Sequence, residues 1–395
     1  MRVVQINLTA RQGGTGRVCY GISKALSENN IENYTLFASN EEQGKFEIKY
    51  GSDFKRKINA LISKIFGNHG FNSHIMTKKL ISHLEKLKPD IVQLHNLHGH
   101  NVNIKMIFSY FKKNPQIKLF WTFHDFWAFT GYCPYFELVE CEKWENGCGN
   151  CPLKNQHSWF FDKSKKLYRK KKELFTGLNL TIVAPSDYIA NKTKQSFLKD
   201  YEIKVIHNGI DLNVFKPTNG DFREKYNLEN KYIVLGVADV WGKRKGLDTF
   251  IKLASRLPKE YQIVLVGTND KIDKLLPKNI ISIHRIQNVA KLTEIYTASD
   301  VFVNPTLDEA FGMVNIEALA CGTPVITYNS GGSPECIDES CGIVVEKNHI
   351  DTLEKSIKDI CEAKTITKNA CVEYAMRFVD NETYRKYLNL YGDIK

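Results

Sequence analysis

Short apolar segments alternate with longer segments of helical periodicity along most of this chain. Apolar runs such as Arg2–Leu8 and Val301–Asn304 are followed by helical patterns such as Gly16–Glu28 and Met313–Cys321. This alternation is typical of βαβ units, which build parallel sheets covered by helices. The chain has 395 residues, whereas a single hydrophobic core rarely grows past about 250–300 residues. We therefore expect an α/β protein with two doubly wound parallel-sheet domains.

Turn-forming residues mark a boundary near the middle of the chain. An Asn208-Gly209 pair is followed by Pro217, and both are strong turn signals. We expect a first domain over residues 1–205, which contains a cysteine-rich insertion at residues 131–153. A second domain would cover residues 206–371, and a C-terminal helix residues 372–395. In doubly wound folds ligands bind at the carboxyl ends of the strands.

Composition and charge limit the class of protein and its partners. Hydrophobic residues make up 43% and charged residues 25% of the chain, which excludes intrinsic disorder as its main state. The net charge of +11 fits nucleic acid, an anionic lipid surface or a small polyanion such as a nucleotide. We find no nucleic-acid-binding signature and expect no nucleic-acid partner. The sequence has no signal-peptide core and no run of about 20 apolar residues, so we expect a cytoplasmic protein.

Two basic segments in the first half have two interpretations. Phe54–Phe66 is amphipathic if helical, and Phe161–Lys172 is more strongly charged. A run of charge is most often a solvated face. The functional alternative is peripheral docking on the anionic inner face of the cell membrane, where each nearby Lys or Arg contributes about 1 kcal/mol.

The segment from Asn304 to Gly322 is the most informative for chemistry. It reads as strand, loop and helix, and the free amides of a helix start bind anions. We therefore predict a phosphate site at Phe311, Gly312, Met313, Val314 and Asn315. Glu317, about one turn into the helix, would accept hydrogen bonds from ribose hydroxyls, and Glu309 on the loop would face a second sugar. The alternative is two surface glutamates around a helix start.

These two glutamates reproduce the E-x7-E pattern of family-4 retaining glycosyltransferases, and the chain resembles that family from its first strand to its last helix. Further motifs of the family are Gly322-Thr-Pro-Val-Ile, Gly331-Gly-Ser-Pro-Glu335, His207-Asn-Gly-Ile-Asp211 and Arg244-Lys-Gly246. The resemblance implies a GT-B fold, in which two Rossmann-like domains face a central cleft. It also implies transfer with retention from a UDP- or GDP-sugar and no catalytic metal. The second domain would bind the donor, the first would bind the acceptor, and the C-terminal helix would return to the first.

The resemblance also assigns roles to cations and glycines. Arg244 and Lys245 would neutralise the donor diphosphate, although the common family arginine lies earlier, just after a strand-ending glycine. The alternative is a solvated basic turn. Gly14 and Gly16 lie in a loop that opens a helix, where glycine lets the backbone approach a ligand closely. In the family this loop faces the donor phosphates and the acceptor; a plain turn is the alternative.

Histidines follow two strands of the first domain. His124 ends the predicted strand Lys118–His124, and the family has a histidine here that contacts the donor sugar, so we predict catalytic roles for His124 and for Glu309. Asp125 would orient His124. His95 and His98 follow the preceding strand and would line the acceptor side. Each of these histidines could instead be a core residue with satisfied hydrogen bonds.

Four cysteines are clustered in the insertion. Cys148-x-x-Cys151 with Cys133 and Cys141 upstream suits a tetrahedral structural zinc site. An iron–sulfur cluster, reduced thiols and a disulfide are the alternatives. A similar cysteine-rich segment occurs in a family-4 subgroup of bacterial surface-polysaccharide synthesis. The resemblance therefore implies a lipid-linked saccharide acceptor in O-antigen, capsule or exopolysaccharide assembly.

Three other functions stay open at this stage. A GT-B sugar-nucleotide epimerase or hydrolase would share the phosphate chemistry. A non-catalytic sugar-nucleotide-binding protein would keep the fold, and a zinc-dependent nucleic-acid module would use the cysteines and the positive charge.

Overall fold

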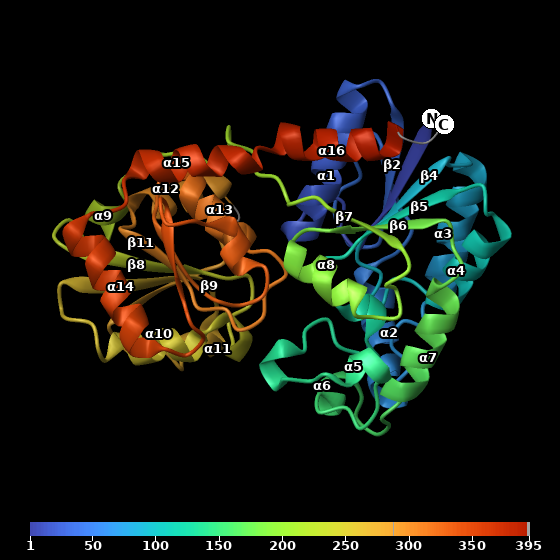
Figure 1. The fold of residues 1–395 in the computed structure, drawn as a ribbon, viewed down its shortest axis with the longest axis horizontal. Coiled ribbons are helices and arrows are strands. Elements are labelled where there is room, and N and C mark those ends of the chain that lie inside the picture. Colours follow the sequence, from blue (N-terminus) through green and yellow to red (C-terminus); the bar gives the residue numbers. More distant parts are fainter. Residues whose placement is uncertain (287, 393–395) are drawn as a thin grey trace. The chain divides into compact units, whose positions relative to one another are not determined.

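The chain folds into two compact α/β units, each built on its own parallel sheet (Figure 1). The structure is a computed structural model that describes residues 1–286 and 288–392. Unit 1 comprises Met1–His207 and Thr383–Lys395, and unit 2 comprises Asn208–Glu382. The expected fold class is confirmed, because both sheets are entirely parallel and carry helices between most successive strands.

Unit 1 contains a seven-stranded sheet in the order β3-β2-β1-β4-β5-β6-β7. Its strands are β1 (Arg2–Ile6), β2 (Glu32–Phe37), β3 (Glu47–Lys49), β4 (Ile91–Leu94), β5 (Lys118–Thr122), β6 (Leu180–Ala184) and β7 (Glu202–Val205). The chain runs outward from β1 in one direction and then returns to build outward from β4 in the other. The carboxyl ends of β1 and β4 therefore form a topological switch point, where such folds bind ligands.

Side-chain caps mark the starts of some helices of unit 1. Ser52 and Asn103 accept hydrogen bonds from the amides of Lys55 and Met106, at the starts of α2 and α4. The helices are α1 (Gly13–Glu28), α2 (Asp53–Phe66), α3 (His74–Leu87), α4 (Ile104–Lys113), α5 (Lys143–Asn146), α6 (Lys154–His157), α7 (Ser164–Phe175) and α8 (Asp187–Lys194), with short 3-10 turns η1 (Trp127–Phe129) and η2 (Glu137–Val139).

Unit 2 contains a six-stranded sheet in the order β10-β9-β8-β11-β12-β13, with its switch point between β8 and β11. The strands are β8 (Tyr232–Val237), β9 (Tyr261–Thr268), β10 (Ile280–His284), β11 (Val301–Asn304), β12 (Val325–Tyr328) and β13 (Gly342–Val345). The helices are α9 (Phe222–Lys225), α10 (Leu247–Ala254), α11 (Asp270–Asp273), α12 (Val289–Ala298), α13 (Met313–Ala320), α14 (Ile350–Ala363) and α15 (Lys368–Ala375), with η3 (Lys243–Lys245), η4 (Ser333–Cys336) and η5 (Met376–Phe378).

The C-terminal region differs from the single helix expected over 372–395. It consists of α15, η5 and α16 (Asp380–Gly392), and only the part from Thr383 onward belongs to unit 1. The break occurs at Val379, where the backbone is extended and pairs with Ile210. The amide of Ile210 donates to the carbonyl of Phe378 at 2.8 Å, and the amide of Asp380 donates to Ile210 at 3.0 Å.

Helix α16 is an integral part of the core of unit 1 and lies beside α1 (Figure 1). Its tyrosines 384, 387 and 391 are buried in one apolar cluster with Val3 and Ile22. The hydroxyl of Tyr387 hydrogen-bonds Thr122 at 3.1 Å. A Cβ at Gly21 of α1 would lie 2.1 Å from the ring of Tyr384, so α16 packs directly on the helix backbone there.

We predict that Tyr387→Ala lowers the free energy of unfolding of unit 1 by about 3–5 kcal/mol, because it removes a buried aromatic ring. Tyr387→Phe is the matched control. It removes only the hydrogen bond to Thr122 and is expected to cost about 1 kcal/mol. Urea titration followed by circular dichroism measures both values. Equal, small losses in the two variants would show that α16 does not pack into this core.

Candidate active site

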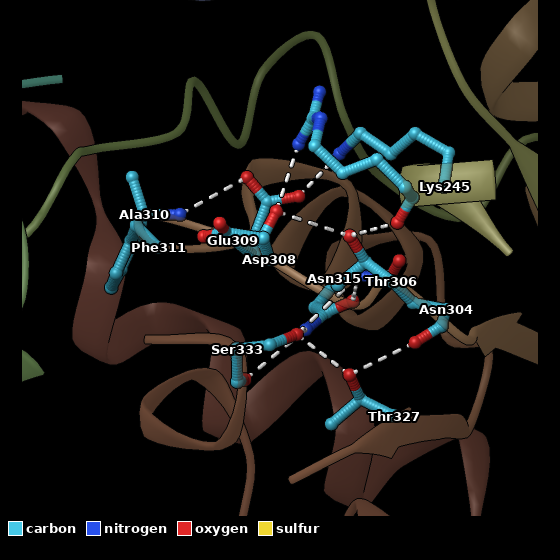
Figure 2. A network of polar contacts seen from close by, with 12 residues as sticks. Lys245, Asn304, Thr306, Asp308, Glu309, Ala310, Phe311, Asn315, Thr327 and Ser333 are labelled. Atoms are coloured by element: carbon cyan, nitrogen blue, oxygen red, sulfur yellow. Dashed lines mark hydrogen bonds and ion pairs between the residues drawn. The ribbon is translucent and has the colours of Figure 1, made fainter. Parts of the chain in front are cut away.

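An ion pair lies at the carboxyl edge of the sheet in unit 2. Lys245, at the end of η3 after β8, pairs through its Nζ with the carboxylate of Glu309 on the loop between β11 and α13 (Figure 2). Both side chains are largely buried, with 18% and 13% of their surface exposed. Arg244 Nη1 donates to the carbonyl of Asp308 at 2.8 Å. The two basic residues and the glutamate predicted from the sequence are therefore brought together in one site.

The charge of Glu309 is set by its neighbours. Burial raises the pKa of Glu309, but the charges of Lys245 and Arg244 and the hydrogen bond from Lys245 outweigh burial and lower the pKa below its usual value. The amide of Ala310 also donates to this carboxylate, at 3.3 Å. Glu309 is therefore an anion at neutral pH, held between two cations.

A glycine allows the Glu309 loop to lie against the loop after β12. Gly331 has a φ of +59°, and a Cβ there would lie 2.0 Å from the carbonyl oxygen of Glu309. The amide of Gly332 donates to that same oxygen at 3.0 Å. Any side chain at position 331 would push the Glu309 loop away.

The start of α13 is fixed by a buried network of polar side chains (Figure 2). Asn304 donates to Asn315 at 2.8 Å, Asn315 donates to Ser333 Oγ at 2.9 Å, and Ser333 hydrogen-bonds Thr327 at 2.6 Å. The helix has no side-chain N-cap, since Gly312 precedes it. The first-turn amides of a helix have no acceptor within the helix and suit an anion.

The residues of the predicted phosphate segment, Phe311 to Asn315, have two different roles. Gly312, Met313 and Val314 contribute backbone amides at the helix start. The side chains of Asn315 and Phe311 serve the protein itself: Asn315 joins the polar network, and the ring of Phe311 packs 5.8 Å from that of Phe378. Ser333 was not singled out from the sequence, although the motif that contains it was noted.

Glu317 is 2% exposed on α13, and the hydroxyl of Tyr296 from α12 donates to it at 3.2 Å. Tyr296 is itself fully buried. No sequence signal distinguishes Tyr296 from an ordinary core tyrosine, because its partner comes from a separate helix. The hydrogen bond fixes the orientation of the Glu317 carboxylate.

In unit 1 the predicted histidines gather at the carboxyl ends of β4 and β5. His95 Nδ1 lies 3.0 Å from His124 Nε2, and His95 Nε2 lies 3.1 Å from Gln5 Oε1. His98 Nε2 lies 2.7 Å from Asp125 Oδ2. The expected Asp125–His124 pairing is therefore replaced by an Asp125–His98 pair and a His124–His95 pair, which line one hollow. The signal missed in the sequence was Gln5, a fully buried polar residue within the apolar strand β1.

His95 and His124 are neutral at physiological pH. Burial lowers the pKa of His124 to about 4, with an opposing contribution from the charge of Asp125, and burial places the pKa of His95 well below 6.5. For Asp125, burial raises the pKa, but the charge and hydrogen bond of His98 lower it below its usual value. The hollow therefore contains the anionic carboxylate of Asp125 and the uncharged imidazoles of His95 and His124.

The two glycines predicted at the start of α1 have different roles. A Cβ at Gly16 would lie 2.7 Å from both the Arg11 carbonyl carbon and Thr9 Oγ1, so Gly16 is required for packing. A Cβ at Gly14 would meet nothing within 4 Å. The backbone at Gly14 is therefore open to a ligand, whereas Gly16 shapes the loop.

The four cysteines of the insertion line a single pocket in unit 1, between β5 and α7. The amide of Gly131 donates to Cys148 Sγ at 3.2 Å. Residues far apart in this loop thus line the same pocket. Among residues 1–286 and 288–392, no helix combines the length and apolar character needed to span a bilayer.

Two Rossmann-like units with polar sites at their strand ends define the GT-B class of glycosyltransferases, and solved structures agree. Sucrose-phosphate synthase from Thermosynechococcus elongatus aligns with a TM-score of 0.76 at 17% identity, over 100% of this chain and 98% of that one. Anabaena Alr3699/HepE in complex with UDP-glucose aligns with a TM-score of 0.70 at 15% identity, over the whole of both chains. These likenesses establish the fold.

The family follows from sequence. Residues 12–214, more than half of the chain, match the model described as Glycosyltransferase Family 4, and residues 219–378 match the model described as Glycosyl transferases group 1. The chain belongs to glycosyltransferase family 4, which confirms the resemblance seen in its motifs. The colanic acid biosynthesis glycosyl transferase WcaC (named as putative) from Escherichia coli K12 is 22% identical over the full length of both chains.

We predict that unit 1 loses stability as the pH falls from about 7 to about 4. The pKa of His124 is about 4 in the folded chain, against about 6.5 when unfolded, so in this window the unfolded chain binds the extra proton. The loss is about 1.4 kcal/mol per pH unit for this one histidine. Urea unfolding at several pH values measures it.

His124→Gln is expected to reduce the slope of the free energy of unfolding against pH, by an amount that corresponds to the uptake of about one proton on unfolding. His284→Gln is the control, because His284 is exposed in unit 2 and its hydrogen bond to the carboxylate of Asp273 raises its pKa. An unchanged slope in His124→Gln would contradict the assigned neutral state.

Proposed function

We propose that this protein transfers a sugar from a nucleoside diphosphate donor to an acceptor hydroxyl, with retention of anomeric configuration, in the assembly of a bacterial surface polysaccharide. The observation that carries the proposal is the buried Lys245–Glu309 pair beside the open start of α13. Cations and helix amides at one sheet edge match a diphosphate.

The relatives support the donor class and the pathway. HepE was solved with UDP-glucose, and WcaC carries the name of a colanic acid glycosyltransferase. Because the identities are 15% and 22%, they leave UDP and GDP as alternative nucleotides. A panel of both nucleotide classes therefore belongs in the first experiment.

In the proposed complex the donor diphosphate binds in unit 2. The amides of Gly312, Met313 and Val314 face the phosphates, and Lys245 and Arg244 supply positive charge. Glu317, oriented by Tyr296, accepts hydrogen bonds from the ribose hydroxyls. These groups stabilise the negative charge that grows on the diphosphate as its bond to the anomeric carbon breaks.

The transfer step uses one face of the donor sugar. The bond from the anomeric carbon to the diphosphate oxygen breaks with its electron pair passing to that oxygen. The acceptor oxygen bonds to the same face of the carbon, and its proton passes to the leaving phosphate. This step conserves charge and needs no catalytic metal.

His124 contacts the donor sugar in this proposal. Its imidazole is neutral, so it donates or accepts a hydrogen bond without placing a positive charge beside a sugar that itself becomes cationic. His95 fixes its orientation through the 3.0 Å contact, and the His98–Asp125 pair lies on the acceptor side.

We predict that Glu309→Gln lowers turnover more than donor affinity, whereas Glu317→Ala weakens donor binding. Tyr296→Phe is the milder companion of Glu317→Ala, since it removes only the hydrogen bond that orients the carboxylate. Its donor affinity is expected to fall by about fivefold to tenfold, the equivalent of one hydrogen bond. Calorimetry with UDP- and GDP-sugars and steady-state kinetics separate the two effects.

Product analysis completes the test. Proton NMR of the glycoside is expected to show the donor's anomeric configuration. An inverted product would contradict retention. An isomerised or hydrolysed donor formed equally with and without acceptor would indicate an epimerase or hydrolase, and donor binding without any chemistry would indicate a non-catalytic protein.

We further propose that the acceptor is lipid-linked and that unit 1 docks on an anionic membrane surface. Helix α2 buries only Ser63, and its apolar residues Phe54, Ile58 and Leu61 are 73%, 44% and 51% exposed. They recur at helical spacing, so one apolar stripe of α2 faces solvent. A helix of this kind suits the interface of a bilayer.

A second apolar segment adjoins α2. Trp159, Phe160 and Phe161 are consecutive and 52%, 67% and 50% exposed. The amide of Trp159 donates to the carbonyl of Lys64 at the end of α2, at 2.7 Å. The lysines on and near these segments add the positive charge that anionic lipid attracts, at about 1 kcal/mol each near the surface. They are Lys55, Lys57, Lys64, Lys163, Lys165 and Lys166.

We predict that the full chain sediments with vesicles containing anionic lipid and much less with zwitterionic vesicles. Trp159 reports the contact, because the chain's other four tryptophans, all within the described residues, are at most 6% exposed. Its fluorescence is expected to shift to the blue and to be quenched by brominated lipid.

The triple variant Trp159→Glu, Phe160→Glu, Phe161→Glu is expected to abolish sedimentation. The charge-matched control is Val214→Glu, Leu275→Glu, Met376→Glu, which alters exposed apolar residues of unit 2 and is expected to bind normally. Equal binding by both triple variants would refute this docking surface.

A further inference from the structure

We infer that Cys133, Cys141, Cys148 and Cys151 hold one structural zinc ion, and that this site fixes the loop carrying Asp125. The four thiols come from one loop between β5 and α7, and all line the same pocket. Four cysteine thiolates are the usual ligand set of a closed tetrahedral zinc site.

The loop needs a cross-link of this kind, because regular structure in it is sparse. Between η1 and α7 it contains only η2, of three residues, and α5 and α6, of four residues each. Such short turns supply few backbone hydrogen bonds. A metal that ties four points of the loop together supplies stability that the backbone does not.

Backbone groups already support the sulfur positions. The amide of Gly131 donates to Cys148 Sγ at 3.2 Å. The carboxylate of Asp162 accepts hydrogen bonds from the amide of Cys151 at 2.7 Å and from the amide of Ser164 at 2.9 Å. These bonds connect the end of the Cys148-x-x-Cys151 turn to the start of α7. Outer hydrogen bonds of this type orient metal ligands.

A buried lysine lies beside the cysteines. Lys171 of α7 is fully buried, and its Nζ donates to the carbonyls of Trp127 at 2.6 Å and Thr130 at 3.0 Å. A buried ammonium group is costly without an opposing charge. Zinc with four thiolates carries a net charge of about −2. Asp125 is the other nearby anion, and it is already paired with His98.

The same contacts link the cysteine pocket to the histidine hollow. The amide of Trp127 donates to Asp125 Oδ1 at 2.9 Å, and Asp125 Oδ2 pairs with His98. The segment 125–131 is thus held at one end by His98 and at the other by Cys148. This second part of the inference rests on the proposed function, since it makes the metal a positioning group for the acceptor side.

Metal analysis tests the first part on the full chain, purified with reductant and without chelator. Plasma mass spectrometry is expected to find about one zinc per chain, which Cys148→Ser and Cys151→Ser lose. Cys361→Ala is the matched control, a buried cysteine of unit 2 that is expected to keep the metal. Lys171→Met is expected to weaken zinc binding, measured by transfer to a chromogenic chelator.

Three results would overturn the zinc site: four freely titratable thiols with no metal, disulfides among these cysteines, or iron in place of zinc. These readouts do not depend on sugar transfer, so they stand whether or not the proposed reaction is correct. For the second part, removal of zinc is expected to raise the KM for acceptor while donor affinity is unchanged. Unchanged acceptor kinetics would refute the link to Asp125.

Discussion

Glu309 is a carboxylate held in a largely buried place at the end of a parallel sheet, and this placement constrains its surroundings. A buried charge without a partner costs several kcal/mol, so Lys245 must lie opposite it and Arg244 close by. The loop that carries Glu309 can approach the loop after β12 only because residue 331 is glycine. The same loop leads directly into α13, whose first amides are thereby presented at the sheet edge beside the two cations.

The two units have the same kind of fold, but the sites at their strand ends differ in charge. Unit 2 gathers cations and helix amides, which suit a group that gains negative charge. Unit 1 gathers His95 and His124, whose pKa values burial lowers, so its hollow holds these two neutral imidazoles and one paired carboxylate. A neutral hydrogen-bonding wall suits a sugar whose anomeric carbon becomes positive. The proposed division of labour between donor phosphate and sugar follows from this contrast.

The sequence predicted most strands because parallel sheets are buried on both faces, so runs such as Ile233–Leu235 are apolar without interruption. It missed β7 because Glu202–Val205 lies at the sheet edge and is mostly exposed, and β3 because it has three residues. It also missed β13, the edge strand Gly342–Val345, in which only the two end residues are buried. Asp125 was assigned to its chain neighbour His124, yet its carboxylate pairs with His98, which is distant in sequence. Tyr296 could not be predicted at all, since its role depends on how two helices pack.

The central claim is that the edge formed by Lys245 and the start of α13 binds a nucleoside diphosphate. A crystal structure of the full chain with UDP or GDP tests this directly. We expect the diphosphate oxygens within hydrogen-bond distance of the amides of residues 312–314 and of Lys245 Nζ, with the ribose against Glu317. A nucleotide bound away from this edge, or one whose phosphates face solvent while the Lys245–Glu309 pair is undisturbed, would contradict the account.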